Sequence, residues 1–234
     1  MWVSVVDTDG TVCHVINTAA EGQSLDKTAY VGNQSWLGSR VISAQKANTA
    51  NAFSLDYYTI STANLFGTVQ GNNSLFGLQH SNPVDTYNAY SAPGTDTSLF
   101  ATATDPMIGK VVGGVNVFGG GLALYTTDGL LGTTKVGAIG VSGDTSCTDH
   151  TVAWKIRKAL ELDNVPRGPI SQGDLFNNAG GALSLREYGI GDEMYIDGTK
   201  IGKSNASGWE HAACPNTPSR AKNAGAILGK LPTD

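Results

Sequence analysis

Hydrophobic and polar positions follow a period of two at the start of the chain. Residues 3–6 are rich in valine, and residues 11–16 alternate between apolar and polar side chains. Between them, residues 7–10 end in Gly10, where a tight turn needs a residue that tolerates a positive φ. This pattern predicts a β-hairpin. It places Cys13 in a strand as a small core residue.

A helical pattern follows a polar and irregular stretch. Ser39 is a good N-cap residue, and Val41, Ala44 and Ala47 then recur at helical spacing. We therefore predict a helix from near Ser39 to about Phe53, which residues 56–64 extend or follow. The small alanines permit close packing of this helix.

Residues 65–105 are the least regular part of the chain. They are rich in Asn, Ser, Pro and Gly, and a structureless run of this length in a compact domain is functional or disordered. One ordered piece, residues 74–80, reads as a strand that ends at His80.

Two strands are predicted in the second half, at residues 122–126 and 135–141. In the tail, residues 194–201 read as a hairpin and residues 221–228 as a frayed helix. The order of elements is two strands, a helix, a loop, two strands and a helix. Links of the hairpin type predict an antiparallel sheet with helices on one face.

The helix between the last strands and the tail carries an apolar stripe. Val152, Ile156 and Leu160 recur every fourth residue, which predicts the buried face of a helix. Thr148 or Asp149 is the expected N-cap, and the helix is expected to end near Leu162. The basic residues Lys155, Arg157 and Lys158 then form a solvated face.

Composition narrows the class of protein. Only 15% of the 234 residues are charged and the net charge is −5, whereas about 25% is usual. Without a basic cluster, nucleic-acid binding is set aside. No apolar run approaches the ~20 residues of a membrane helix. The length fits one large domain or two small ones.

The turn at residues 143–146 is the first candidate site. A turn that leads into a helix exposes backbone N–H groups and the positive end of the helix dipole, so Asp144 and Thr145 mark a possible anion site; simple helix capping is the alternative. His150 follows in the first helical turn, where a neutral imidazole could ligate iron or relay a proton. A buried or surface histidine with a backbone partner is the alternative.

Two further histidines are candidate ligands. His80 ends the predicted strand in the irregular region, and loops carry binding residues. His211 lies next to Trp209 and Glu210 and near Cys214, a combination that could border a flat apolar ligand. Ordinary surface histidines are the alternative for both.

Glycines and a possible acid–base set complete the candidates. Gly119, Gly120 and Gly121 precede a strand, so they are no dinucleotide fingerprint and instead indicate close backbone approach to a ligand or another subunit. An acid–base set could combine Tyr125, Cys147, Asp149 and His150, with Asp144 nearby. No Cys-x-x-Cys-His motif is present, so any haem would be held non-covalently.

Three segments carry a resemblance to a known family. Residues 120–129, 137–144 and 149–154 read Gly-Gly-x-x-Leu-Tyr-x-x-Asp-Gly, Gly-Ala-Ile-Gly-Val-Ser-Gly-Asp and Asp-His-x-x-Ala-Trp. Together with residues 2–10 and the helix at 43–53, they resemble the GlcG/HbpS (DUF336) family of haem-binding proteins. The resemblance covers residues 2 to about 165, and residues 166–234 resemble the tail of longer, exported members.

The resemblance implies a fold and an organisation. It implies an α/β fold with a five-stranded antiparallel sheet, flanking helices of profilin-like layout, and assembly into homo-oligomers. We expect a family domain at residues 1–165 with a C-terminal extension, residues 166–234, packed on it. Cys147 and Cys214 lie in segments like those of exported members, so a disulfide between them and a periplasmic or secreted location, with no leader visible, are expected. Three reduced cysteines in a cytoplasmic protein are the alternative.

The resemblance also implies non-covalent binding of haem or a related small ligand, in haem handling or redox sensing. His80, His150 and His211 are then candidate iron ligands, and Gly119 to Gly121 with the Asp144-Thr145 turn form the cradle. Two other hypotheses stay open. One is a lyase or isomerase acting on a small carboxylated or aromatic catabolite at residues 143–150. The other is an oligomeric assembly module without a ligand.

Overall fold

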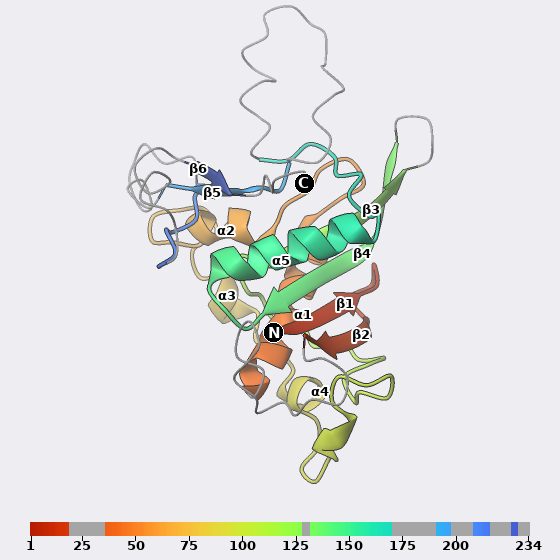
Figure 1. Ribbon diagram of the computed structural model, residues 1–234. Helices are drawn as coiled ribbons and strands as arrows, with labels where there is room; N and C mark the ends of the chain where they lie inside the picture. The colour runs from red at the N-terminus through yellow and green to blue at the C-terminus, as the bar shows by residue number, and fades with distance from the viewer. Residues whose placement is uncertain (19–35, 128–131, 170–190, 198–207, 216–225, 229–234) are drawn as a thin grey trace, which may run out of the picture.

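A computed structural model describes residues 1–18, 36–127, 132–169, 191–197 and 208–215, and the backbone of residues 226–228. A central antiparallel sheet lies between two long helices, α5 on one face and α1 on the other (Figure 1). The elements in chain order are β1 (Trp2–Val6), β2 (Val12–Asn17), α1 (Leu37–Phe53), α2 (Thr62–Thr68), α3 (Leu78–Ser81), α4 (Thr86–Tyr90), the 3-10 helix η1 (Thr97–Leu99), β3 (Gly121–Thr127), β4 (Thr133–Ser142), α5 (Ser146–Ala159), β5 (Met194–Ile196) and β6 (Ala226–Leu228).

The main sheet has the strand order β2-β1-β4-β3, and every neighbouring pair is antiparallel. Its two predicted hairpins, β1 with β2 and β3 with β4, are confirmed. Among the described residues this sheet has four strands, so the fifth expected strand is not found there. Strands β5 and β6 pair with each other in a separate two-stranded sheet.

Alternate residues of β4 point to opposite faces of the sheet and pack against different helices. Ile139 and Val141 form one core with Ala153 of α5. Ala138 forms the other core with α1, where Ala44 and other small residues allow close contact. The pattern-based expectation of helices on one face is therefore wrong, because the layers are helix, sheet, helix. The layout implied by the family resemblance has this arrangement.

Helix α1 begins two residues before the predicted start and ends at the predicted Phe53. It carries a buried cation, Arg40, whose guanidinium is ion-paired with Asp105 and donates to the carbonyl of Ala89 at 2.9 Å. Arg40 also lies over the ring of Phe100. These contacts hold much of the irregular region against α1, which explains how a segment with so little periodicity is ordered.

The predicted strand at residues 74–80 is wrong. Gly77 has a φ of +89° and is the N-cap of the short helix α3, so the chain turns within the apolar run. His80 lies on α3 and is exposed to solvent. A helix of one turn leaves no period long enough to distinguish it from a strand in the sequence.

Helix α5 begins earlier than predicted and buries a different face. Thr145, rather than Thr148 or Asp149, is its N-cap. The predicted stripe is partly wrong, because Leu160 is 52% exposed. The buried residues are instead Cys147, Asp149, His150, Ala153 and Arg157.

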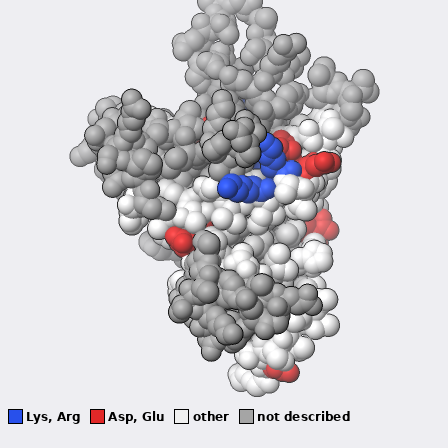
Figure 2. Space-filling view, viewed as in Figure 1, with Lys and Arg blue, Asp and Glu red and all other residues white. Residues whose placement is uncertain are grey.

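Arg157 was expected on a solvated face and is instead buried, with Nη1 2.6 Å from Oδ2 of Asp192. The carboxylate of Asp192, in the C-terminal tail, thus stabilises an orientation of α5 in which a partly polar face is buried. Lys155 and Lys158 are exposed as predicted, and basic side chains gather over α5 in Figure 2.

The tail differs from its sequence-based description. β5 pairs with the more distant β6. The second half of the predicted hairpin, residues 198–201, lies outside the described residues, so that hairpin stays a prediction. The helix predicted at 221–228 is wrong at residues 226–228, which form a strand, and residues 221–225 are not described. Asp192 is bound by Arg157 of α5, and β5 contacts α2, but the domain boundary at 165 stays a prediction.

The free cysteine lies at the sheet edge. Cys13 of β2 is half-buried rather than a core residue, and its neighbour His14 is exposed. No helix in the described part of the chain has the length and apolar character needed to cross a membrane.

Candidate functional site

A buried ion pair closes one end of the sheet. Nζ of Lys46, on α1, lies 2.8 Å from Oδ2 of Asp149 on α5 and donates to the carbonyl of Val141 at 2.9 Å. The second oxygen of Asp149 accepts from the backbone N–H of Asp144 at 3.0 Å. Burial lowers the pKa of Lys46 and raises the pKa of Asp149, while the attraction between the two groups opposes both changes. Asp149 therefore holds two helices and a turn together.

The glycines at 119–121 pass through a gap too narrow for any side chain. A Cβ at Gly119 would lie 2.6 Å from the carbonyl oxygen of Ser146 and 3.1 Å from Cβ of His150. A Cβ at Gly120, whose φ is +120°, would lie 3.0 Å from Cβ of Asp149. The close backbone approach predicted here is to the protein's own helices, and a ligand-cradling role for these glycines stays a prediction.

His150 lies directly behind these glycines, on the buried face of α5. It is 1% exposed, and its Nδ1 accepts a hydrogen bond from the backbone N–H of Gly120 at 3.4 Å. Its Nε2 has no hydrogen-bond partner within the described part of the chain. Burial lowers the pKa of His150 to about 3, with Asp192 acting in the opposite direction. The imidazole is therefore neutral at physiological pH.

His211 reaches the same region from the C-terminal segment. It is 2% exposed, and its Nδ1 lies 2.7 Å from the carbonyl oxygen of Ala212. The ring of Phe66 lies 4.7 Å away, centroid to centroid. Like that of His150, its Nε2 has no hydrogen-bond partner among the residues described. Burial lowers the pKa of His211 to about 4, although the hydrogen bond to the backbone of Ala212 acts to raise this pKa.

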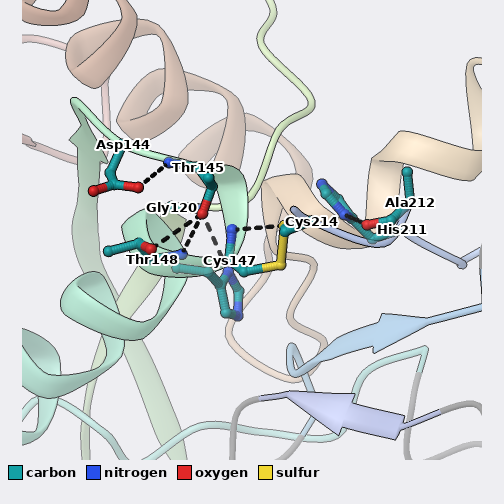
Figure 3. The surroundings of a disulfide bond; sticks show 9 residues. Gly120, Asp144, Thr145, Cys147, Thr148, His211, Ala212 and Cys214 are labelled. Carbon is teal, nitrogen blue, oxygen red and sulfur yellow. Dashed lines mark hydrogen bonds between the residues drawn. A yellow bond between two sulfur atoms is a disulfide. The ribbon is translucent and has the colours of Figure 1, made fainter. Parts of the chain in front are cut away.

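A disulfide joins the elements that carry these two histidines. Cys147 and Cys214 are bonded, as predicted, and each stands three residues from one of the histidines. Figure 3 shows this bond between the turn of Asp144 and Thr145 and the segment of His211 and Ala212. Since Cys147 is used in the bond, it offers no thiol for the proposed acid–base set.

Other predicted site residues lie elsewhere or have structural partners. The hydroxyl of Tyr125 donates to the carbonyl of Leu55 at 3.0 Å, and burial raises the pKa of Tyr125 to about 12. Oδ1 of Asp144 accepts from the N–H of Thr145 at 2.6 Å, and Thr145 caps α5, so both take part in capping. The structure does not bring the exposed His80 into this site.

Two residues near the site were missed by sequence reasoning. Lys46 stands among the alanines of α1, and a charge on an otherwise small-residue helix face was a usable signal. Met194 could not be found in this way, because only the fold brings its Cε beside Gly119. No group of three or more His, Cys, Asp or Glu residues in the described segments could hold a metal ion.

Comparison with known proteins places the chain in a family. The family model described as haem degrading protein HbpS-like matches residues 18–157, which is more than half of the chain. The chain belongs to the HbpS-like family. Cys147 and His150 lie within the matched segment, whereas His211 and Cys214 lie beyond it. The candidate site of this HbpS-like protein thus combines the family segment with the C-terminal extension.

Two solved structures resemble this HbpS-like chain in part. The Klebsiella pneumoniae protein ORFY, of family DUF336, is 24% identical over 68% of this chain and 74% of that chain, with a TM-score of 0.40. A PduOC–heme complex is 22% identical over 68% of this chain and 76% of that chain, with a TM-score of 0.40. No curated protein matches the chain.

Proposed function

We propose that this protein binds haem, or a related small ligand, non-covalently at the buried histidines His150 and His211. One observation carries the proposal, namely that both Nε2 atoms are buried without a hydrogen-bond partner among the described residues. An unpaired buried polar group costs about 1–3 kcal/mol, and most such groups in folded proteins are paired. A ligand that contacts these nitrogens would remove that cost.

The chemistry of the two imidazoles suits a metal-containing ligand. A metal binds neutral imidazole, and burial keeps both rings neutral because it lowers the pKa of His150 to about 3 and that of His211 to about 4. The Phe66 ring beside His211 offers an apolar contact for a flat ligand. Membership of a family described as haem-degrading supports haem as the first ligand to test. When bound, haem would supply a redox-active, Lewis-acidic iron.

Ligand entry requires movement, because both histidines are almost fully buried. The segment at residues 208–215 covers α2, where its backbone oxygens lie against Gly67, and is bonded to α5 through the disulfide. We infer that this segment shifts when the ligand binds. The disulfide would keep the shift small by holding Cys214 beside the first turn of α5.

Mass spectrometry tests non-covalent binding. Native spectra of the protein mixed with haem should show one haem per chain, and denaturing spectra should show the bare chain. The sequence has no Cys-x-x-Cys-His attachment motif, and Cys147 and Cys214 are bonded to each other. Spectra with several weakly held haems per chain, unaffected by replacement of the two histidines, would refute the proposal.

The other hypotheses gain less support from the geometry. The acid–base set lacks a thiol at Cys147, which is in the disulfide. The hydroxyl of Tyr125 donates a hydrogen bond to the carbonyl of Leu55 rather than to another member of the set. Homo-oligomerisation stays a prediction, and the glycines at 119–121 do not support it because they pack inside the subunit. We propose a location outside the cytoplasm, supported by the disulfide, since disulfides persist in oxidising compartments. Cell fractionation of the native host would test this.

A further inference from the structure

We propose that the two histidines present opposite hydrogen-bonding groups to one ligand. His211 offers an unprotonated Nε2 as an electron-pair donor, and His150 offers an Nε2–H as a hydrogen-bond donor. The site would then select a ligand that carries both a Lewis-acidic centre and an oxygen acceptor. This inference rests on the proposed function and specifies the chemistry of its ligand.

The neighbour of His211 determines where its proton resides. The carbonyl oxygen of Ala212 lies 2.7 Å from Nδ1, and a carbonyl oxygen can only accept. Nδ1 must therefore carry the proton and donate it. In the neutral ring the lone pair is then on Nε2, which is buried and unpaired within the described residues. Histidines that ligate metals commonly donate their other N–H to a backbone carbonyl in this way.

The neighbour of His150 has the opposite effect. The backbone N–H of Gly120 can only donate, and it points at Nδ1 across 3.4 Å. Nδ1 must therefore be unprotonated, and in the neutral ring the proton is on Nε2. As long as this contact with Gly120 persists, His150 can donate a hydrogen bond through Nε2 but cannot ligate a metal there.

The disulfide makes these two groups parts of one site. Cys147 precedes His150 by three residues and Cys214 follows His211 by three residues. The two rings are close enough for a charge on His211 to lower the pKa of His150. Haem matches this pair of groups in kind, because its iron accepts an electron pair and its propionates accept hydrogen bonds.

Side-chain nitrogen NMR of the ligand-free wild-type protein tests the assignment directly. Long-range ¹H–¹⁵N correlation spectra distinguish the two neutral tautomers of each histidine. The expected result is a proton on Nδ1 of His211 and on Nε2 of His150. The same tautomer at both positions would overturn the inference. Because no variant is needed, loss of folding cannot obscure the answer.

Haem complexes of two variants test the consequence. His211→Ala should lose the spectrum of nitrogen-ligated iron and regain it with added imidazole. His150→Ala should keep that spectrum and bind haem roughly tenfold more weakly, the value of one hydrogen bond. If His150→Ala, rather than His211→Ala, lost this spectrum and regained it with added imidazole, the assignment of roles would be overturned. If wild-type protein binds no haem at all, the proposed function fails, whereas the tautomers still decide what the two groups offer.

Discussion

Nζ of Lys46 lies 2.8 Å from Oδ2 of Asp149, and this contact joins the helices that cover opposite faces of the sheet. Both side chains are almost fully buried, at 2% and 3% exposure. Gly120 packs against both side chains, where a larger residue would not fit. His150 follows Asp149 directly in α5. The position of His150 therefore depends on an ion pair that no local pattern in the sequence specifies.

Breaking this ion pair should destabilise the protein strongly. Lys46→Met leaves the Asp149 carboxylate buried without its partner, which typically costs 3–5 kcal/mol. Denaturation by urea would measure the loss in free energy of unfolding. Lys155→Met, on the exposed face of α5, is the control and should change stability by less than about 0.5 kcal/mol. Equal effects of the two substitutions would contradict the structural role.

The glycine gap makes a second prediction. Gly119→Ala should cost several kcal/mol, because the new Cβ would lie 2.6 Å from the carbonyl oxygen of Ser146. Gly71→Ala is the matched control, since a Cβ there meets nothing within 4 Å. Thermal unfolding of both variants is the measurement. A Gly119→Ala variant as stable as Gly71→Ala would show that the gap is wider than described.

The disulfide should contribute much of the stability of the C-terminal segment. Cys147 and Cys214 are 67 residues apart, and closing a loop of this size is worth about 4 kcal/mol in the chain-entropy description. The double variant Cys147→Ala/Cys214→Ala should lose stability of this order and show faster hydrogen exchange at residues 208–215. Cys13→Ala should do neither, because Cys13 is not part of a disulfide. Exchange rates unchanged by the double substitution would contradict this account.

Acid should weaken the ligand-free fold through the two buried histidines. Their pKa values fall from 6.5 to about 3 for His150 and about 4 for His211. Below pH 6.5 the unfolded chain takes up protons that the folded chain does not, so stability is complete above that pH and declines below it. The expected loss is roughly 2 kcal/mol per histidine between pH 8 and pH 5.

Substitution by glutamine separates this effect from other acid-sensitive groups. His150→Gln/His211→Gln should flatten the dependence of unfolding free energy on pH between 8 and 5, whereas the exposed His80→Gln should leave it unchanged. Lys46, Arg157 and Asp192 also act on His150 and remain in every variant. The same slope in the double variant and the wild type would mean that these histidines are not kept neutral by the fold.

Much of the sheet could be predicted because its strands are specified locally. The hairpin around Gly10 and the strands of the second half have alternating or β-rich patterns with turn residues between them. Residues 74–80 have a similar apolar character, but Gly77 adopts a positive φ and starts a helical turn. A run of seven residues does not distinguish these outcomes.

The inward face of α5 could not be predicted from its own sequence. Its apolar stripe indicated Leu160, whereas the buried cation Arg157 is stabilised by Asp192, 35 residues further along the chain. This pairing depends on the tertiary structure, which brings the C-terminal tail against α5, and no local sequence pattern indicates it. His150 was predicted from its place in the first turn of a helix, and His211 from its neighbours in the sequence. The direction of their hydrogen bonds depends on Gly120 and Ala212, which only the fold brings beside them.

A haem titration followed by Soret absorbance tests the central claim most directly. Wild-type protein and the exposed-histidine control His80→Ala should give the same saturable, red-shifted band at one haem per chain. His150→Ala/His211→Ala, shown to be folded by circular dichroism, should give only weak, non-saturating absorbance. Saturable binding of equal affinity in the double variant, or none in the wild type, would contradict the claim that the buried histidines form a haem site.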